Sequence, residues 1–431
     1  MRVRRAPGRV ASLGRVDGST PLSRRLRGPL AALVLALAAP GGALASPESG
    51  LRESLTSLME AAPSPSGAFV RDADDGKRLF AWKHTRARIL ASNTKLFTIG
   101  AALARYGPDG RLATRAMAAH PLRASGVVEG NLYLVGGGDP TFGSRAFVRE
   151  HYGGGGTVEQ LANRLHDGGL REVRGRVVGD ESLYDSKRSG PSEGYEVSTE
   201  LGGPMSALAY NHGLTSDGRF QADPAKYAAA RLTAALRNEG VDVAKPARDG
   251  RAPDGAAALA ETSSLPMSGI ARLTGVPSEN FFAEMLAKGV GDGTTAGGAS
   301  AIVGFARTRA VTELSLADGS GLARSDRSPP QQIVFYLDRQ RAAPEFGAFF
   351  GALPTAGVDG TLADRMTSGY AHRNCHAKTG TLRDVSALSG YCATRGGHTL
   401  VFSILMNGVS SIADAQRLQD RMAEKIAKYT G

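Results

Sequence analysis

The sequence is poor in cysteine and in long apolar runs. Its 431 residues include only two cysteines, Cys375 and Cys392, with one tryptophan and eight histidines. Two thiols cannot alone assemble a cysteine-based zinc or iron–sulfur site. Past residue 45, no stretch approaches the ~18 uncharged apolar residues expected of a membrane-spanning helix, which argues against a retained span.

Acidic residues are also fewer than basic ones, 41 against 52, which gives a net charge of +11. Residues 1–45 hold eight Arg and one Asp, and therefore +7 of that charge. They also contain the apolar run Pro29–Ala39 and the small-residue pattern Ala43-Leu44-Ala45, which are typical of a secretory signal peptide. We therefore expect an exported chain of the periplasm or cell envelope with no nucleic-acid partner. The pair Arg24-Arg25 leaves twin-arginine and general secretory export open.

Strand and helix patterns alternate along the mature chain. Apolar residues at helical spacing predict helices over Thr94–Arg105, from Ser278 onward, and over Ser300–Arg309, Gln331–Arg339 and Ala413–Tyr429. Strands are predicted at Gly67–Val70, Arg78–Trp82, His376–Leu382, Val385–Ala393 and His398–Met406.

The middle of the chain, residues 112–258, has a different pattern of predicted strands and helices. Short strands such as Asn131–Val135 and Arg174–Val178 alternate there with helices at Thr157–His166 and Pro224–Asn238. We interpret it as an α/β domain inserted into an α+β domain, whose two parts are residues 46–111 and 259–431.

A serine and a lysine lie three positions apart at the start of the first predicted helix, in Ser92-Asn93-Thr94-Lys95. On a helix start the two share a face, so the amine of Lys95 can take the proton of the Ser92 hydroxyl. Burial and a second cation, for which Lys378 is the candidate, would lower the pKa of Lys95 toward neutrality. Such a pair also arises by chance, so its meaning depends on other motifs.

Two other motifs accompany this pair. Ser278-Glu279-Asn280 fits Ser-x-Asn, and Lys378-Thr379-Gly380 lies on a predicted strand. Together with Ser-x-x-Lys, these are the three elements of the penicillin-recognising serine enzymes. Ser278 can relay a proton to the leaving amine, and Asn280 can hold Lys95 and a substrate amide.

The strand motif suits an extended peptide substrate. Lys378 and Thr379 can meet a carboxylate, while Gly380 lets the substrate backbone approach closely. The backbone N–H groups of Ser92 and Thr381 are the natural donors to an oxyanion.

Beyond these motifs, the chain resembles the D-alanyl-D-alanine carboxypeptidase/endopeptidase family, the class C low-molecular-mass penicillin-binding proteins. The resemblance implies a transpeptidase/β-lactamase-like domain, with an antiparallel sheet flanked by helices and an insertion after the nucleophile helix. It also implies release of D-Ala from peptidoglycan stem peptides, often with cleavage of crosslinks, through a penicillin-sensitive acyl-enzyme on Ser92. The segments that carry it are Ala91–Leu96, Gly136–Thr141, Asp318–Leu322, Gly357–Leu362 and Ala377–Leu382.

The chain departs from that family in three places. The interval from Ser92 to Ser278 is short for relatives with two nested insertions. Relatives often continue the Asp-Gly-Ser-Gly-Leu segment with Ser-Arg-x-Asn, whereas this chain reads Ala323-Arg324-Ser325-Asp326. The family's acidic contact to the substrate's free amine should fall near residues 191–199, where we favour Glu196 over Glu193.

Other readings remain open. A β-lactamase would use the same three motifs, and a non-catalytic peptidoglycan-binding protein would keep the fold. Ser320 in its glycine-rich segment is better explained by a turn than as a nucleophile. His372 and His376 would lie about 13 Å apart on a strand, too far to share a metal ion, so we expect no metal and no cofactor.

The two cysteines fall on neighbouring predicted strands. A hairpin that turns near Arg383-Asp384 pairs residues whose numbers sum to about 767, which places Cys375 opposite Cys392. We expect a cross-strand disulfide there, with a pair of buried thiols as the alternative.

Overall fold

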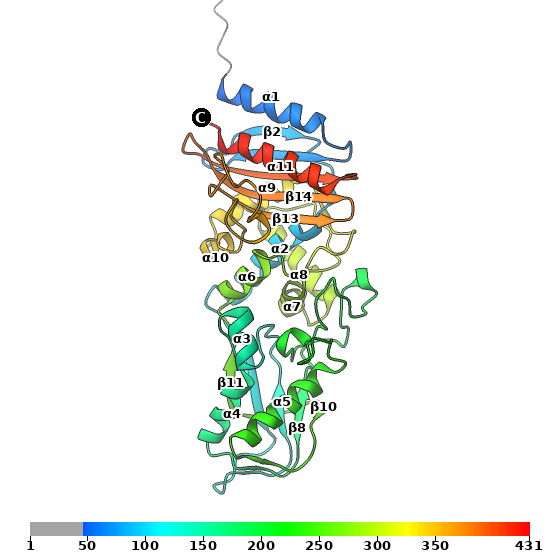
Figure 1. Ribbon diagram of the computed structural model, residues 1–431, viewed down its shortest axis with the longest axis vertical. Helices are drawn as coiled ribbons and strands as arrows, with labels where there is room; N and C mark the ends of the chain where they lie inside the picture. The colour runs from blue at the N-terminus through cyan, green and yellow to red at the C-terminus, as the bar shows by residue number, and fades with distance from the viewer. Residues whose placement is uncertain (1–45) are drawn as a thin grey trace, which may run out of the picture. The chain divides into compact units, whose positions relative to one another are not determined.

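The computed structural model describes residues 46–431, so the predicted signal peptide lies outside the described residues. A five-stranded antiparallel sheet joins strands from both ends of this part of the chain (Figure 1). β1 pairs with β15 from Gly67 opposite Leu405 to Asp72 opposite Leu400. The strand order is β13 (Cys375–Leu382), β14 (Val385–Ala393), β15 (Thr399–Asn407), β1 (Gly67–Asp72) and β2 (Arg78–Trp82).

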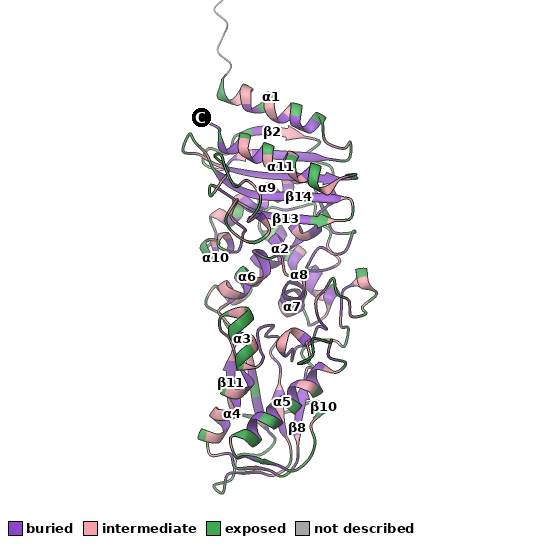
Figure 2. Ribbon diagram, viewed as in Figure 1, coloured by how far each residue is buried: buried purple, intermediate pink, exposed green. Residues whose placement is uncertain are grey.

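Both faces of this sheet are covered. In β15, Leu400, Phe402 and Ile404 join the core formed with α1 (Pro47–Glu60) and α11 (Ile412–Ala427). Val401 and Leu405 join the core on the opposite face. Side chains of a strand alternate between the two faces, so a strand that is apolar at nearly every position becomes buried on both sides (Figure 2).

The helix that follows Ser92 forms the centre of the opposite core. In α2 (Thr94–Tyr106) every residue from Thr94 to Leu103 is buried, including the polar Thr94, Lys95 and Thr98. The hydroxyl of Tyr336 donates to the carbonyl oxygen of Leu96 at 3.0 Å. The helices packed around α2 or against the sheet are α6 (Met267–Gly275), α7 (Asn280–Val290), α8 (Thr295–Thr308), α9 (Pro330–Arg341) and α10 (Phe346–Phe350).

A second five-stranded sheet mixes parallel and antiparallel pairs. Its core contains Leu134 of β6 together with Leu161 and Leu232 of the covering helices. Its order is β10 (Arg248–Asp249), β8 (Val177–Asp180), β6 (Leu132–Val135), β4 (Ala113–Ala118) and β11 (Ala257–Ser263), and its helices are α3 (Arg145–Tyr152), α4 (Val158–Asp167) and α5 (Pro224–Asn238). The smaller sheets are β5 (Val127–Val128), β7 (Glu172–Val173) and β9 (Asp242–Val243), and β3 (Arg88–Ile89) with β12 (Arg327–Ser328).

The predicted α+β class is confirmed, although some elements differ. The single strand predicted over Arg174–Val178 is two strands, β7 and β8, in different sheets. Between β7 and β8 the chain passes close to Gly130. The N–H of Gly175 donates to the carbonyl oxygen of Gly130 at 2.7 Å. The helices α1, α3, α6 and α10 were not predicted. None of the helices within residues 46–431 is long and apolar enough to cross a bilayer.

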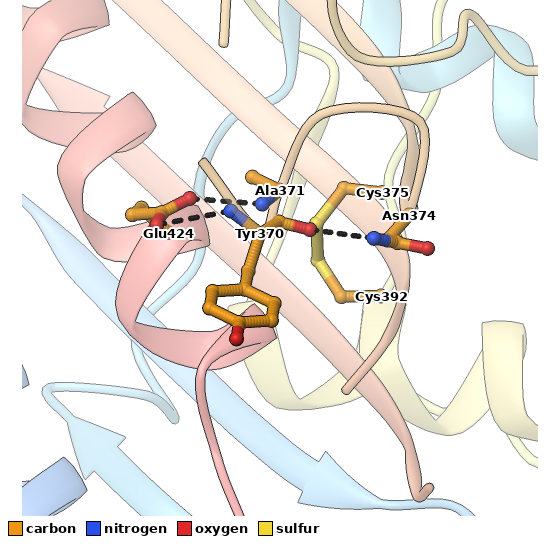
Figure 3. The surroundings of a disulfide bond; sticks show 6 residues. All are labelled: Tyr370, Ala371, Asn374, Cys375, Cys392 and Glu424. Carbon is orange, nitrogen blue, oxygen red and sulfur yellow. Dashed lines mark hydrogen bonds between the residues drawn. A yellow bond between two sulfur atoms is a disulfide. The ribbon is translucent and has the colours of Figure 1, made fainter. Parts of the chain in front are cut away.

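The predicted disulfide is confirmed. Cys375 and Cys392 are register partners of β13 and β14, and their sulfur atoms are bonded. The turn before β13 is also tied to α11, because Glu424 accepts from the backbone N–H groups of Tyr370 and Ala371 at 3.1 and 2.8 Å (Figure 3). The start of the strand that carries Lys378 is thus fixed on two sides.

Candidate active site

Ser92 lies in a strained turn. It belongs to a one-turn 3-10 helix, Ala91–Asn93, and α2 begins at Thr94, as predicted. Ala91 has φ 47°, a left-handed conformation that is costly for a residue with a side chain. The loop around Gly321 packs so tightly here that a Cβ on Gly321 would lie 1.9 Å from the carbonyl oxygen of Ala91. Packing therefore holds the turn that presents the half-buried Ser92.

The amine of Lys95 is buried and points at three oxygen atoms. Its Nζ lies 3.0 Å from Ser92 Oγ, 2.7 Å from Asn280 Oδ1 and 2.8 Å from the carbonyl oxygen of Ser320. Burial lowers the pKa of Lys95 to about 8, against the opposing charges of nearby carboxylates such as Glu279. A neutral amine can donate to the amide and carbonyl oxygens, so its lone pair then faces the Ser92 hydroxyl.

The Ser-Glu-Asn segment lies just before α7. Ser278 has φ 66°, which excludes it from the helix, and α7 therefore begins at Asn280 rather than at Ser278. Glu279 caps the helix by accepting from the N–H of Phe282 at 2.8 Å. Ser278 itself is half-buried on the same turn.

Two residues from the segment between β8 and β10, Glu200 and His212, contact the Ser-Glu-Asn segment and the start of α7. Asn280 Nδ2 donates to the carbonyl oxygen of Glu200 at 2.7 Å. His212 stacks on Phe281 with ring centroids 4.3 Å apart, and its Nε2 lies 3.6 Å from Glu279 Oε1. Burial lowers the pKa of His212 to about 4, so the ring is neutral. Neither Glu200 nor His212 belongs to a recognisable motif.

Strand β13 runs directly beside Ser92. A Cβ on Gly380 would lie 2.8 Å from the carbonyl oxygen of Leu90 and 3.0 Å from the backbone nitrogen of Ser92. Asn93 Nδ2 donates to the carbonyl oxygen of Lys378 at 3.1 Å. Any residue larger than glycine at position 380 would push the strand away from the nucleophile turn.

The side chains of the Lys-Thr-Gly motif are more buried than expected for residues that meet a substrate. Lys378 is buried, and its Nζ donates to the carbonyl oxygen of Thr379 at 3.0 Å. Burial, and then the charge of Lys95, lower the pKa of Lys378 well below its usual value. Thr379 Oγ1 donates to Thr361 Oγ1 at 2.7 Å, while Thr381 is exposed. Thr361 belongs to the Gly357–Leu362 segment, but its contact was not anticipated.

Buried carboxylates shape the loop that binds Lys95. Glu284 Oε1 accepts from the N–H groups of Gly319 and Ser320 at 3.0 and 2.8 Å, and this orients the carbonyl of Ser320 toward Lys95. Burial raises the pKa of Glu284 to about 7. The hydroxyl of Ser320 accepts from the N–H of Leu322 at 3.4 Å, as expected for a turn. Glu284 was not predicted as a site residue from the sequence, because it is a single carboxylate among the largely apolar residues of α7.

A cavity of about 780 Å³ begins at the end of β13, where Leu382 is part of its wall. Glu193 also lines it, whereas Glu196 is exposed and is not part of the lining. Arg324 donates to both carboxylate oxygens of Asp384, at 2.7 and 3.2 Å. The lining residues are Pro191, Ser192, Glu193, Leu322, Ala323, Arg324, Ser325, Leu382, Arg383 and Asp384.

Among residues 46–431, one group has the spacing of metal ligands, formed by Asp72, Asp74 and His398. Its oxygen atoms already have partners. Asp72 accepts from the N–H of Asp74 and pairs with His398, and Asp74 accepts from the N–H of Thr399 and from Arg341. These contacts stabilise the β1–β2 turn and the neighbouring strand.

A serine beside a buried lysine, an asparagine on that lysine and a glycine-containing strand along the serine together define an active-site serine hydrolase of the penicillin-recognising type. The sequence model of the D-Ala-D-Ala carboxypeptidase 3 (S13) family matches residues 51–217 and 206–429. The chain belongs to this family and is a peptidase.

Curated relatives and a solved structure agree with this assignment. The chain is 29% identical to a D-alanyl-D-alanine carboxypeptidase of Actinomadura sp. (strain R39), over 88% of this chain and 85% of the relative. It is 28% identical to carboxypeptidase DacB of Mycolicibacterium smegmatis, over 84% and 82% of the two chains. The crystal structure of penicillin binding protein 4 (dacB) from Haemophilus influenzae has the same fold, with a TM-score of 0.72, 19% identity, and coverage of 87% of this chain and 99% of that chain.

Proposed function

We propose that the chain is a serine D-alanyl-D-alanine carboxypeptidase, with a capacity for D,D-endopeptidase cleavage of crosslinks, that acts on peptidoglycan stem peptides and is inhibited by penicillin. The observation that carries the proposal is the 3.0 Å contact between Lys95 Nζ and Ser92 Oγ. The names of the carboxypeptidase relatives support the choice of substrate.

In the proposed acylation step, neutral Lys95 takes the proton of the Ser92 hydroxyl while Oγ attacks the carbonyl carbon between the two D-Ala residues. The carbonyl oxygen becomes an oxyanion, for which the N–H groups of Ser92 and Thr381 are the proposed donors. The C–N bond then breaks, and the proton passes from Lys95 through Ser278 to the leaving amine. D-Ala leaves, and an ester remains on Ser92.

Deacylation repeats these steps with water as the nucleophile. Lys95 takes a proton from water as it attacks the ester carbonyl, and returns it to Ser92 Oγ when the ester bond breaks. Asn280 keeps the amine directed at Ser92 throughout, because its Oδ1 accepts from Lys95 at 2.7 Å. A β-lactam forms the same ester, but its leaving group stays attached to the acyl part.

For substrate recognition we propose that the stem peptide extends along β13, with its terminal carboxylate near Thr379 and Lys378. Glu193 replaces Glu196 as our candidate for the free amine of the third stem residue, because Glu193 lines the cavity at the end of that strand. The cavity also offers Arg324 to a carboxylate.

We further propose the domain division and location of the protein. The signal-peptide pattern of residues 1–45 and the disulfide support export to the periplasm or cell envelope. The inserted domain is placed at residues 112–263 rather than 112–258, because β11 pairs with β4 as far as Ser263. The parts on either side form the transpeptidase-like domain.

Labelled penicillin and a diacetylated Lys-D-Ala-D-Ala peptide test the proposal with the purified mature protein. We expect a long-lived adduct on Ser92, located by mass spectrometry of its tryptic peptide, together with D-Ala release. Rapid turnover of penicillin without D-Ala release would instead identify a β-lactamase. Neither adduct nor release would identify a non-catalytic peptidoglycan-binding protein.

A further inference from the structure

A histidine of the inserted domain lies against the turn that carries Ser278 and Asn280. The ring of His212 stacks on Phe281, with ring centroids 4.3 Å apart and an angle of 30° between the planes. Its Nε2 lies 3.6 Å from Glu279 Oε1, and only 16% of its side chain is exposed. No step of the proposed mechanism uses this ring.

The backbone that presents His212 has an uncommon conformation. His212 has φ 58° and Asn211 has φ 48°, so two successive residues with side chains are left-handed. Such a conformation persists only where surrounding contacts offset its cost. Asn211 Oδ1 accepts from the N–H of Ser144 at 2.8 Å, and a Cβ on Gly203 would lie 2.2 Å from the carbonyl oxygen of His212. Packing within the inserted domain therefore fixes the backbone from which the ring reaches α7.

The hydroxyl of Tyr152 determines which ring nitrogen of His212 carries the hydrogen. It lies 3.2 Å from Nδ1, and a neutral imidazole has one N–H and one lone pair. When the hydroxyl donates to Nδ1, the hydrogen lies on Nε2 and faces the carboxylate of Glu279. The other tautomer would point a lone pair at that carboxylate, which is unfavourable. The 3.6 Å contact is longer than a hydrogen bond, so it contributes an attraction between the N–H dipole and the carboxylate.

The inserted domain also sets the orientation of the Asn280 amide. Asn280 Nδ2 donates to the carbonyl oxygen of Glu200 at 2.7 Å, and its Oδ1 accepts from Lys95 at 2.7 Å. A backbone carbonyl oxygen can only accept. The contact with Glu200 therefore permits only the amide orientation that turns Oδ1 toward Lys95.

Apolar packing joins these contacts into one unit. Leu201 and Met205 of the inserted domain share a buried cluster with Phe281 and Phe282 of α7. A shift of His212 would therefore be transmitted to the start of α7, where Asn280 is the first helical residue.

We propose that His212 is a positioning residue that holds the turn Ser278–Asn280 in place for Lys95. The inserted domain is then part of what makes acylation fast, in addition to any part in substrate binding. This role rests on the proposed function of Ser92, and it acts on the rate of the chemical step.

His212→Asn tests the role with little change to the backbone, because asparagine tolerates a left-handed conformation. Its side chain ends near the position of Nδ1, so it cannot contact Glu279, and it has no ring to stack on Phe281. We expect the rate constant of penicillin acylation, measured per folded molecule, to fall about tenfold to 100-fold. With the diacetylated peptide, kcat should fall by a similar factor and KM should stay within about twofold.

His212→Gln is the conservative variant. Its amide nitrogen reaches the position of Nε2, so it should recover part of the acylation rate that His212→Asn loses. An acylation rate of His212→Asn equal to that of the wild type would overturn the proposal. A rate of His212→Gln no higher than that of His212→Asn would overturn the contact with Glu279 on which the proposal depends.

Two tyrosines separate positioning from packing of the inserted domain against α7. The hydroxyl of Tyr152 contacts His212, whereas the hydroxyl of Tyr184 donates to the carbonyl oxygen of Met285, further along α7, at 3.0 Å. Tyr152→Phe should lower the acylation rate about threefold, the effect of one hydrogen bond. Tyr184→Phe should lower the thermal unfolding midpoint but leave the acylation rate unchanged. Equal losses of acylation in both variants would reject the positioning role.

Nitrogen NMR of the histidine rings gives a readout that does not depend on activity. The ring signals that disappear in His212→Asn belong to His212, and we expect them to show the hydrogen on Nε2. A hydrogen on Nδ1 in the wild type would overturn the contact with Glu279.

Failure of the proposed function gives a different result. A wild type that forms no penicillin adduct would reject the proposed function of Ser92. A wild type and a His212→Asn variant that are acylated at the same rate would leave that function standing and reject the positioning role alone.

Discussion

The two halves of the candidate site differ in how far their charged side chains are buried. In the covered half, Lys95, Asn280 and Lys378 have their polar atoms paired within the chain, and Lys95 and Lys378 are fully buried. In the open half, Arg324 and Asp384 line a cavity with 52% and 40% of their side chains exposed. Burial lets the protein set the pKa of an amine, whereas exposure lets a charged substrate reach its partners.

The difference extends to what each hydrogen bond contributes. In the covered half, an unpaired polar atom would stay buried, so removal of one partner leaves the other at full desolvation cost. In the open half, water replaces a lost partner, and an exposed ion pair contributes little to stability. The pair Arg324–Asp384 can therefore exchange partners with a substrate at small cost.

Ser92→Ala should have the largest effect, and only on the chemistry of the covered half. Without a nucleophile no ester can form, so we expect penicillin acylation to fall on the order of 10⁴-fold or more. The thermal unfolding midpoint should change little, because Ser92 is half-buried and loses only its contact to Lys95. An adduct of unchanged yield on the variant would show that another residue is the nucleophile.

Loss of the disulfide should act on the stability of the covered half. Cys375 and Cys392 are 17 residues apart in sequence. A closed loop of this size contributes about 3 kcal/mol to the free energy of unfolding. The double variant Cys375→Ser with Cys392→Ser should lose that amount in urea unfolding.

Acylation of the folded double variant should stay within about threefold of the wild type, since the register of β13 and β14 is also held by backbone pairing. Reduction of the wild type by dithiothreitol serves as the control for the two serines. A collapse of acylation without loss of stability would mean that the bond positions Lys378 rather than stabilising the sheet.

The pH dependence of acylation should separate the two halves. The protonated form of Lys95 cannot accept a proton, so the rate should fall toward tenfold per pH unit below its pKa of about 8, or about 50-fold from pH 8 to pH 6. The charge of Glu279 raises the pKa of Lys95, so Glu279→Gln should move the midpoint to lower pH. Glutamine can still cap α7.

Glu193→Gln, in the open half, is the matched control for that shift. Its carboxylate lies in the cavity and is not among the charges that shift the pKa of Lys95. The midpoint of the pH dependence of acylation should be the same in Glu193→Gln as in the wild type. A shift of equal size for both variants would show that the two halves are electrostatically one site.

The covered half could be predicted well because its motifs are local and its strands are regular. The spacing of Ser92 and Lys95 and the hairpin pairing of Cys375 with Cys392 follow from short-range geometry, and both contacts are present. Glu284 could not be predicted, because its function depends on which loop packs against α7. The predicted start of α7 was wrong by two residues, because Ser278 has φ 66° and the helix begins at Asn280.

The open half was harder to predict because no sequence motif determines the conformation of its loops. Glu193 and Glu196 are three residues apart, and only a turn decides which one faces the cavity. That turn is the 3-10 helix Pro191–Glu193, which ends at Gly194 in a left-handed conformation. A sequence alone cannot give the direction in which such a turn points its carboxylate.

The smallest expected effect concerns the choice between Glu193 and Glu196 as the contact for the substrate amine. With a stem peptide whose third residue carries a free amine, Glu193→Gln should raise KM about threefold to tenfold and leave kcat nearly unchanged, because an exposed ion pair contributes only ~1 kcal/mol. The diacetylated peptide lacks the amine, so its KM should not respond. Glu196→Gln, an equally conservative change outside the cavity lining, should alter neither substrate. An effect confined to Glu196→Gln would restore that residue as the amine contact, and equal effects on both peptides would show that Glu193 shapes the cavity without pairing with the amine.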